Sequence, residues 1–123
     1  MNPKVKAKWV AALRSGRYKQ GHGALAISSG RAHVSDKFCC LGVLCDLAVQ
    51  AKVIPAPTLA PDNEWYSYEH AYGELPHEVM TWAGLDSADP WVPLNGSDHN
   101  LSTLNDDHRL SFKRIARLVE THL

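Results

Sequence analysis

The sequence has no apolar run near the ~18 residues that a membrane-spanning helix needs, and its N-terminal segment has no uninterrupted signal-peptide core. It has no net charge, because 13 Lys and Arg balance 13 Asp and Glu. No internal repeat or low-complexity tract interrupts a composition that is 45% hydrophobic and 21% charged. We therefore expect a soluble cytoplasmic protein with a single globular domain over residues 1–123 and no contact with a membrane.

The common metal, phosphate and disulfide patterns are also missing. Neither C-x-x-C nor H-x-x-x-H spacing occurs, and there is no Walker or G-x-G-x-x-G glycine pattern. Adjacent Cys39 and Cys40 cannot bridge without strain, and Cys45 lies on the same predicted helix, about 140° from Cys40 at ~100° per residue. We expect three free thiols and neither a metal nor a cofactor. A zinc site that borrows His22 or His33 is the alternative.

Basic and acidic residues are strongly segregated along this neutral chain. Residues 1–37 hold eight Lys or Arg against one Asp, a net charge of +7, and residues 38–107 hold one Lys against eleven acids, a net charge of −10. Residues 108–123 return to a net charge of +3. Such a division marks either a surface for an anionic partner or ion pairs between the basic ends and the acidic middle. We favour the ion pairs, because a dedicated nucleic-acid binder is usually basic overall.

Local signals predict a first helix that begins at Pro3 and ends before Gly16. Asn2 is a suitable N-cap, and proline is favoured at the first helical position. One stripe of this helix is apolar and predicts its packing face, which consists of Val5, Trp9, Ala12 and Leu13.

The run over residues 38–49 is nearly unbroken in apolar residues and carries all three cysteines. It predicts a second helix, capped by Ser35 or Asp36 and extending to about residue 51. Because this helix is apolar on almost every side, we expect it to lie at the centre of the fold.

The remaining segments predict short elements. We expect a hairpin from residues 24–27 and 31–34, a long loop with a short strand over 55–73, a helix over 75–84, an edge strand over 90–94, a helix over 101–106 and a last helix capped by Ser111, with a Leu110–Ile115 hydrophobic staple. The predicted fold class is α+β: one compact, mainly helical domain with a central cysteine-rich helix and a small β-hairpin or sheet.

One candidate chemistry is thiol catalysis. A papain-like hydrolase or transferase needs a cysteine at a helix N-terminus, a histidine as base and a polar residue that orients the histidine. Cys40 suits the first role, and we take His99 and Asn105 as the partners. Further candidates for the base and the orienting group are His70, His77, His108 and Asp106. We favour the simpler interpretation that the cysteines are small buried hydrophobic residues.

A second candidate is a binding surface built from two loops. The glycine-containing loop at residues 17–23 places flexible backbone beside cationic, aromatic and amide groups, which suits a phosphate or carboxylate ligand. The long loop adds aromatic residues that commonly anchor an interface. The predicted ligand- or partner-binding residues are Arg17, Tyr18, Lys19, Gln20, Trp65, Tyr66, Tyr68 and Tyr72. The alternative, which we weigh equally, is that the aromatic residues cap the core beneath the long loop.

A third candidate is DNA binding. Residues 101–119 have the length and pattern of a helix-turn-helix, with Lys113, Arg114 and Arg117 on the exposed side of its second helix. If Ser111 begins the positioning helix of such a motif, no room is left for a reading helix. We therefore favour a packing helix with a solvated basic face.

Several blocks of the sequence occur together in a known group. They are W-V-x-A-L-R-S-G-x-Y-x-Q-G at 9–21, F-C-C-L-G-V-L-C-D-L at 38–47, the 75–85 segment, L-N-D at 104–106 and S-F-x-x-I-A at 111–116. This set resembles small uncharacterised proteins encoded by bacteriophages, prophages and related bacterial elements. The resemblance implies a phage or mobile-element origin, a single domain and a bacterial cytoplasmic location, and it implies no particular activity. Residues 107–110 depart from the glycine turn expected after L-N-D.

The functional hypothesis is a small phage-type accessory protein that binds a host protein or a small anionic ligand without catalysis. The alternatives are the Cys40-centred enzyme and a DNA-binding regulator that uses the C-terminal helices.

Overall fold

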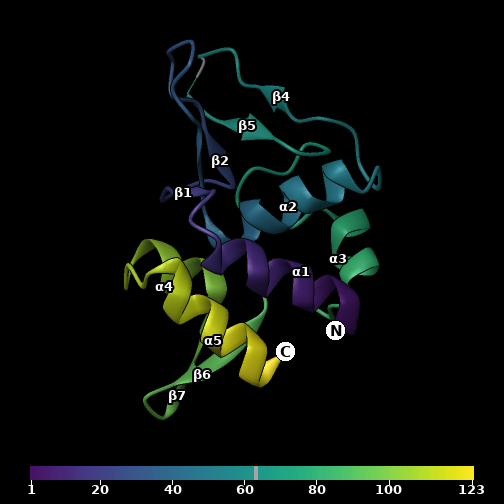
Figure 1. Cartoon of the computed structure of the whole chain (residues 1–123), viewed down its shortest axis with the longest axis vertical. Helices are drawn as coiled ribbons and strands as arrows, with labels where there is room; N and C mark the ends of the chain where they lie inside the picture. Colours follow the sequence, from purple (N-terminus) through teal and green to yellow (C-terminus); the bar gives the residue numbers. More distant parts are fainter. Residues whose placement is uncertain (63) are drawn as a thin grey trace.

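A computed structural model of the chain describes residues 1–62 and 64–123. The described part is an α+β fold with short sheets, as the sequence predicts (Figure 1). Its helices are α1 (Pro3–Arg14), α2 (Cys40–Gln50), α3 (His77–Ala83), α4 (Leu101–Asp106) and α5 (Phe112–His122). In this part of the chain, no helix is long and apolar enough to cross a membrane.

The strands form three small sheets. They are β1 (Lys19–Gln20), β2 (Ala26–Ile27), β3 (Lys37–Phe38), β4 (Thr58–Leu59), β5 (Tyr66–Ser67), β6 (Trp91–Leu94) and β7 (Ser97–Asn100). In the first sheet, β3 is central, parallel to β1 and antiparallel to β2. The antiparallel pairs β4–β5 and β6–β7 form the others. The predicted strand over 90–94 is confirmed as β6, whereas β7 was not foreseen because its sequence, Ser-Asp-His-Asn, is polar throughout.

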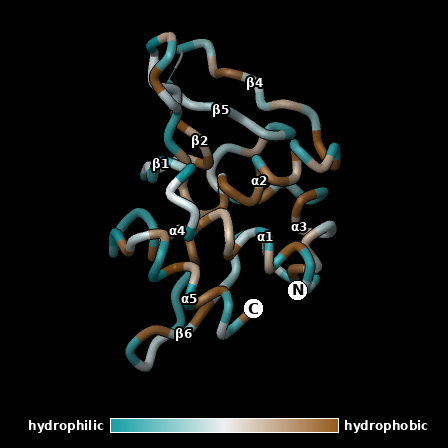
Figure 2. The backbone as a smooth tube through the Cα atoms, viewed as in Figure 1, coloured by the Kyte–Doolittle hydropathy of each residue, from teal (hydrophilic) through white to brown (hydrophobic). Residues whose placement is uncertain are grey.

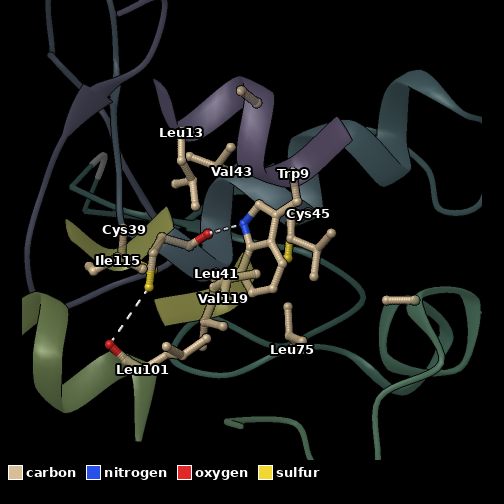
Figure 3. Packing of buried hydrophobic residues seen from close by; sticks show 14 of the residues in the cluster. Trp9, Leu13, Cys39, Leu41, Val43, Cys45, Leu75, Leu101, Ile115 and Val119 are labelled. Atoms are coloured by element: carbon tan, nitrogen blue, oxygen red, sulfur yellow. Dashed lines mark hydrogen bonds between the residues drawn. The ribbon is translucent and has the colours of Figure 1, made fainter. Parts of the chain in front are cut away.

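Helix α2 lies at the centre of the core, as its apolar sequence predicts (Figure 2). All three cysteines are buried and free. The indole of Trp9 is fully buried and donates from Nε1 to the backbone oxygen of Cys40 at 2.9 Å (Figure 3). This bond fixes α1 against the first turn of α2, because an unpaired indole N–H would be costly in the core.

The terminal helices pack against each other, and their predicted caps are confirmed. The side chain of Asn2 accepts from the backbone N–H groups of Lys4 and Val5, and the Ser111 hydroxyl accepts from that of Arg114. Helices α1 and α5 lie side by side, and the N- and C-termini are close together (Figure 1). Two segments from opposite ends of the sequence therefore share one face of the molecule.

The predicted hairpin is wrong in its second strand. Residues 31–34 form a turn, because Gly30 and His33 have positive φ angles of 69° and 66°. The hydroxyl of Ser29 also donates to the backbone oxygens of Arg31 and Val34. Strand β2 pairs instead with β3, a few residues further along the chain.

The predicted cap of the cysteine helix is also wrong. Neither Ser35 nor Asp36 caps α2, since residues 37–38 are in a strand. The N-cap is Cys39, whose sulfur accepts from the backbone N–H of Gly42 at 3.3 Å. The helix therefore begins inside the core.

Gly42 is the position at which α2 approaches the β2 segment most closely. A Cβ atom added to Gly42 would lie 1.7 Å from the backbone oxygen of Leu25. Because that neighbour is backbone, the clash has no cheap relief, and we expect Gly42→Ala to lower the free energy of unfolding by about 3 kcal/mol or more. Thermal unfolding should show a melting temperature about 10 °C lower.

Gly73→Ala is the matched control, since a Cβ there meets nothing within 4 Å. Its melting temperature should stay within a few degrees of wild type. Equal melting temperatures for the two variants would contradict the close packing of α2 on the Leu25 backbone.

Candidate functional site

The loop at residues 17–23 is fastened to the core by the buried side chain of Asn105. Asn105 Oδ1 accepts from Gln20 Nε2 at 2.8 Å and from the backbone N–H of Cys40 at 3.1 Å, while Asn105 Nδ2 donates to the backbone oxygen of Gly21 at 2.9 Å. Gln20 Nε2 also donates to the backbone oxygen of Leu110. The predicted ligand residue Gln20 is therefore partly buried, and its amide nitrogen is bonded to Asn105 and Leu110.

The papain-like arrangement does not form. Cys40 is fully buried and its sulfur contacts the backbone oxygen of Leu101 at 3.6 Å. Burial raises the pKa of the Cys40 thiol well above its usual value, so its position in the first turn of α2 yields no thiolate. The predicted partners of Cys40 make other contacts. The ring of His99 packs edge-on against that of His108, with the ring centroids 4.9 Å apart, and Asn105 binds backbone groups.

Cys39 and Cys45 are also buried, and neither thiol is expected to form a thiolate. Burial raises the pKa of Cys39 to about 12, and it raises the pKa of Cys45 well above its usual value. In the described residues, no group of three or more His, Cys, Asp or Glu side chains is arranged to hold a metal ion.

An open hollow lies beside Tyr18, near the start of the loop at residues 17–23. It has a volume of about 340 Å³ and is lined by Arg17, Tyr18, Ser35, Asp36, Phe38 and Asp46. The Tyr18 hydroxyl donates to the Asp46 carboxylate, and burial together with this bond raises the pKa of Tyr18 to about 12. Because two carboxylates face one guanidinium, the hollow does not suit the anionic ligand that we expected here.

The predicted aromatic residues of the long loop differ in how far they are exposed. Trp65 and Tyr72 stack with their ring centroids 4.5 Å apart, and Tyr72 is 53% exposed. Tyr66 is partly buried and donates its hydroxyl to Asp36. Tyr68 is a correction: it is only 2% exposed and belongs to the hydrophobic core, so it cannot contact a partner.

The Trp65–Tyr72 stack lies on a part of the molecule that we call the distal lobe, made of residues 26–38, 55–62 and 64–73. The first and third segments are joined by a bridge between Ile27 and Trp65 and by a bond from the Ser28 N–H to the Glu64 oxygen at 2.8 Å, and the β4–β5 pair joins the second segment to the third. The lobe contains β2, β3, β4 and β5 and lies in the upper part of Figure 1. Three of the four large hydrophobic residues found exposed in the described chain lie here: Val34, Leu59 and Tyr72.

The expected ion pairs between the basic ends and the acidic middle do not form in the described residues. The salt bridge that is present joins Arg14 of α1 to Glu120 of α5 at 3.0 Å, which links the two basic ends to each other. Lys113, Arg114 and Arg117 are exposed on α5, as predicted. Because α1 packs on α5, Lys6 and Arg14 of the first basic segment lie beside the basic last helix.

These features define a small α+β domain whose polar and thiol groups serve the core and whose distinctive side chains lie on its surface. The whole chain, residues 1–123, matches the family model described as a domain of unknown function, DUF8296, and the protein belongs to that family. Neither the curated proteins nor the solved structures contain a match to the chain.

The burial of the thiols predicts slow chemistry with a small disulfide reagent at neutral pH. All three cysteines should react at less than a hundredth of the rate of a free thiol, because each is buried with a raised pKa. Addition of denaturant should make all three react at once, as seen by absorbance of the released thiolate. Fast reaction of Cys40 alone in the native protein would contradict this structure.

The hydrogen bonds of Asn105 predict a large stability effect. Asn105→Ala removes three hydrogen bonds and leaves two buried groups without a partner, the Cys40 N–H and the Gly21 oxygen, whereas the Gln20 amide keeps its bond to the Leu110 oxygen. We expect a loss of about 3 kcal/mol in denaturant unfolding. The control Asn100→Ala removes one bond, to the Asp89 oxygen, and should cost about 1 kcal/mol. Equal costs would show that Asn105 does not organise these segments.

Proposed function

We propose that this protein is a non-catalytic accessory protein of a phage or mobile element that binds a host protein in the bacterial cytoplasm through its distal lobe. The observation that carries the proposal is the Trp65–Tyr72 stack, in which a ring that is 53% exposed is held rigid by a partly buried tryptophan. Rigid aromatic side chains lose little conformational entropy on binding and often dominate the energy of an interface.

The surroundings of the stack suit a protein partner. Leu59 is 38% exposed and Val34 is 43% exposed, so apolar surface is present on both loops of the lobe. Exposed apolar surface commonly marks an interaction site.

Charge indicates the chemistry of the partner. The lobe contains Arg31 and Lys37 against four acids, Asp36, Asp62, Glu64 and Glu69, a net charge of −2. A complementary host surface is apolar at its centre and basic at its rim. The small anionic ligand of the sequence hypothesis has less support, because the 17–20 loop binds the core and the adjacent hollow holds two carboxylates.

The test is capture from a bacterial host lysate, followed by identification of the captured protein and measurement of its affinity in purified form. The double variant Leu59→Glu with Tyr72→Glu places negative charge on two exposed positions. It should weaken binding by at least thirtyfold, because loss of a hot spot costs about 2 kcal/mol or more. Its melting temperature should stay near that of wild type.

Trp91→Ala is the control, since Trp91 is equally exposed, at 58%, but lies outside the distal lobe. This variant should bind the host protein with unchanged affinity. Unchanged affinity of the Leu59/Tyr72 variant, or capture of no host protein by the wild type, would refute the proposal.

A further inference from the structure

A second surface, remote from the distal lobe, has a strong positive charge. We call it the α1–α5 face and define it by Lys6, Arg14, Lys113, Arg114, Arg117 and Glu120. Five cations stand against one carboxylate, and that carboxylate is already paired with Arg14. The pairing lowers the pKa of Glu120, so it remains ionised and occupied by Arg14. None of the other four cations forms a salt bridge among the described residues, although Lys6 and Arg117 lie close enough to Glu120 to contribute to the lowering of its pKa.

The face is grooved on both sides of α5. Between α5 and β6 is a hollow of about 330 Å³, whose floor is Leu94 and Leu118 and whose cations are Lys113, Arg114 and Arg117. Between α1 and α5 a wider groove of about 600 Å³ contains Lys6 and Arg14 above small apolar residues of α1. Positive charge therefore borders two adjacent depressions, a shape that follows a chain of anionic groups better than a single ion.

An exposed tryptophan lies near the C-terminal end of α5. Trp91 of β6 is 58% exposed, the largest exposed fraction among the large hydrophobic residues of the described chain. It shares a hollow of about 360 Å³ with His122 and Leu123, the last residues of the α5 segment. Asp86 also lines that hollow. A flat aromatic surface beside a line of cations is the arrangement on which unpaired bases stack.

We propose that the α1–α5 face binds single-stranded nucleic acid without sequence preference. The backbone phosphates lie along Lys113, Arg114 and Arg117 and continue toward Lys6, while a base stacks on Trp91. Guanidinium groups suit phosphate because they donate two parallel hydrogen bonds. A single strand fits better than a duplex, because only an unpaired base presents a free ring face to Trp91.

This site differs from that of the proposed function. In Figure 1 the distal lobe is at the top and the β6–β7 hairpin at the bottom, with α1 and α5 between them. A host protein on the lobe therefore leaves the α1–α5 face accessible. A mutation that abolishes one binding activity should leave the other intact. The failure of one proposal would therefore not refute the other.

The experiment is fluorescence anisotropy of a labelled oligothymidylate of about 20 nucleotides, titrated with the full chain. We expect a dissociation constant in the micromolar range at low salt, and an affinity that falls steeply as salt rises, because each phosphate contact releases counterion. With four or five contacts, the slope of log K against log salt should be about −3. The variant Lys113→Glu with Arg117→Glu should lose at least tenfold in affinity.

Two further variants test the assignment. Trp91→Ala should weaken binding by about fivefold or more with little change in the salt slope, since it removes stacking and no charge. The control Lys37→Glu with Lys52→Glu makes the same change in net charge at exposed positions away from the face, and its affinity should stay within about threefold of wild type. Melting temperatures of all variants establish that they are folded.

Several results would overturn the proposal. These are no anisotropy change at low salt, equal losses in the Lys37/Lys52 and Lys113/Arg117 variants, or no effect of Trp91→Ala. Tighter binding of a duplex of the same length would assign the face to double-stranded DNA instead. Displacement of the strand by polyglutamate at equal charge concentration would assign it to acidic proteins.

Discussion

The side-chain amide of Asn105 is the interaction on which the arrangement of the remaining segments depends. It binds Cys40, Gly21 and Gln20, which are 65, 84 and 85 residues away in the chain. A fully buried amide must find partners, because an unpaired polar group in the core costs more than the bond itself contributes. The start of α2, the β1 loop and α4 are therefore fixed relative to one another, and no buried side-chain nitrogen or oxygen in the described chain lacks a partner.

That constraint also decides what the cysteines do. Because the backbone N–H of Cys40 is bound by Asn105 and its backbone oxygen by Trp9, the first turn of α2 is enclosed by polar contacts from α4 and α1. Cys39 completes the enclosure as the N-cap of the helix. Desolvation outweighs the field of the helix N-terminus, so the thiols remain protonated and act as small apolar side chains. Binding chemistry is consequently left to exposed side chains on the lobe and on the terminal helices.

The sequence predicted the elements whose signals are local. Asn2 and Ser111 cap their helices as expected, and the apolar run over 38–49 does lie at the centre of the core. The sequence did not predict the features that depend on contacts between residues far apart in the chain. The start of α2 was predicted three or four residues too early because Ser35 and Asp36 are suitable caps, whereas the Asp36 carboxylate accepts from Ser29 and Tyr66. Tyr68 was included among the binding residues because aromatic residues commonly anchor interfaces, but the composition of a loop does not reveal which ring faces the core.

Charge shows the same division between local and long-range information. The counts for the three segments are correct, yet they carry no information on which segments become neighbours. The packing of α1 on α5, with the Arg14–Glu120 ion pair at the contact, brings like-charged ends together and leaves the acidic middle elsewhere. An electrically neutral chain thereby acquires a cationic face and a weakly acidic lobe. Each creates its own electrostatic potential, which extends over a Debye length of about 8 Å at physiological salt. Net charge, which argued against an anionic partner, is for this reason a poor guide to a molecule whose opposite charges are separated in space.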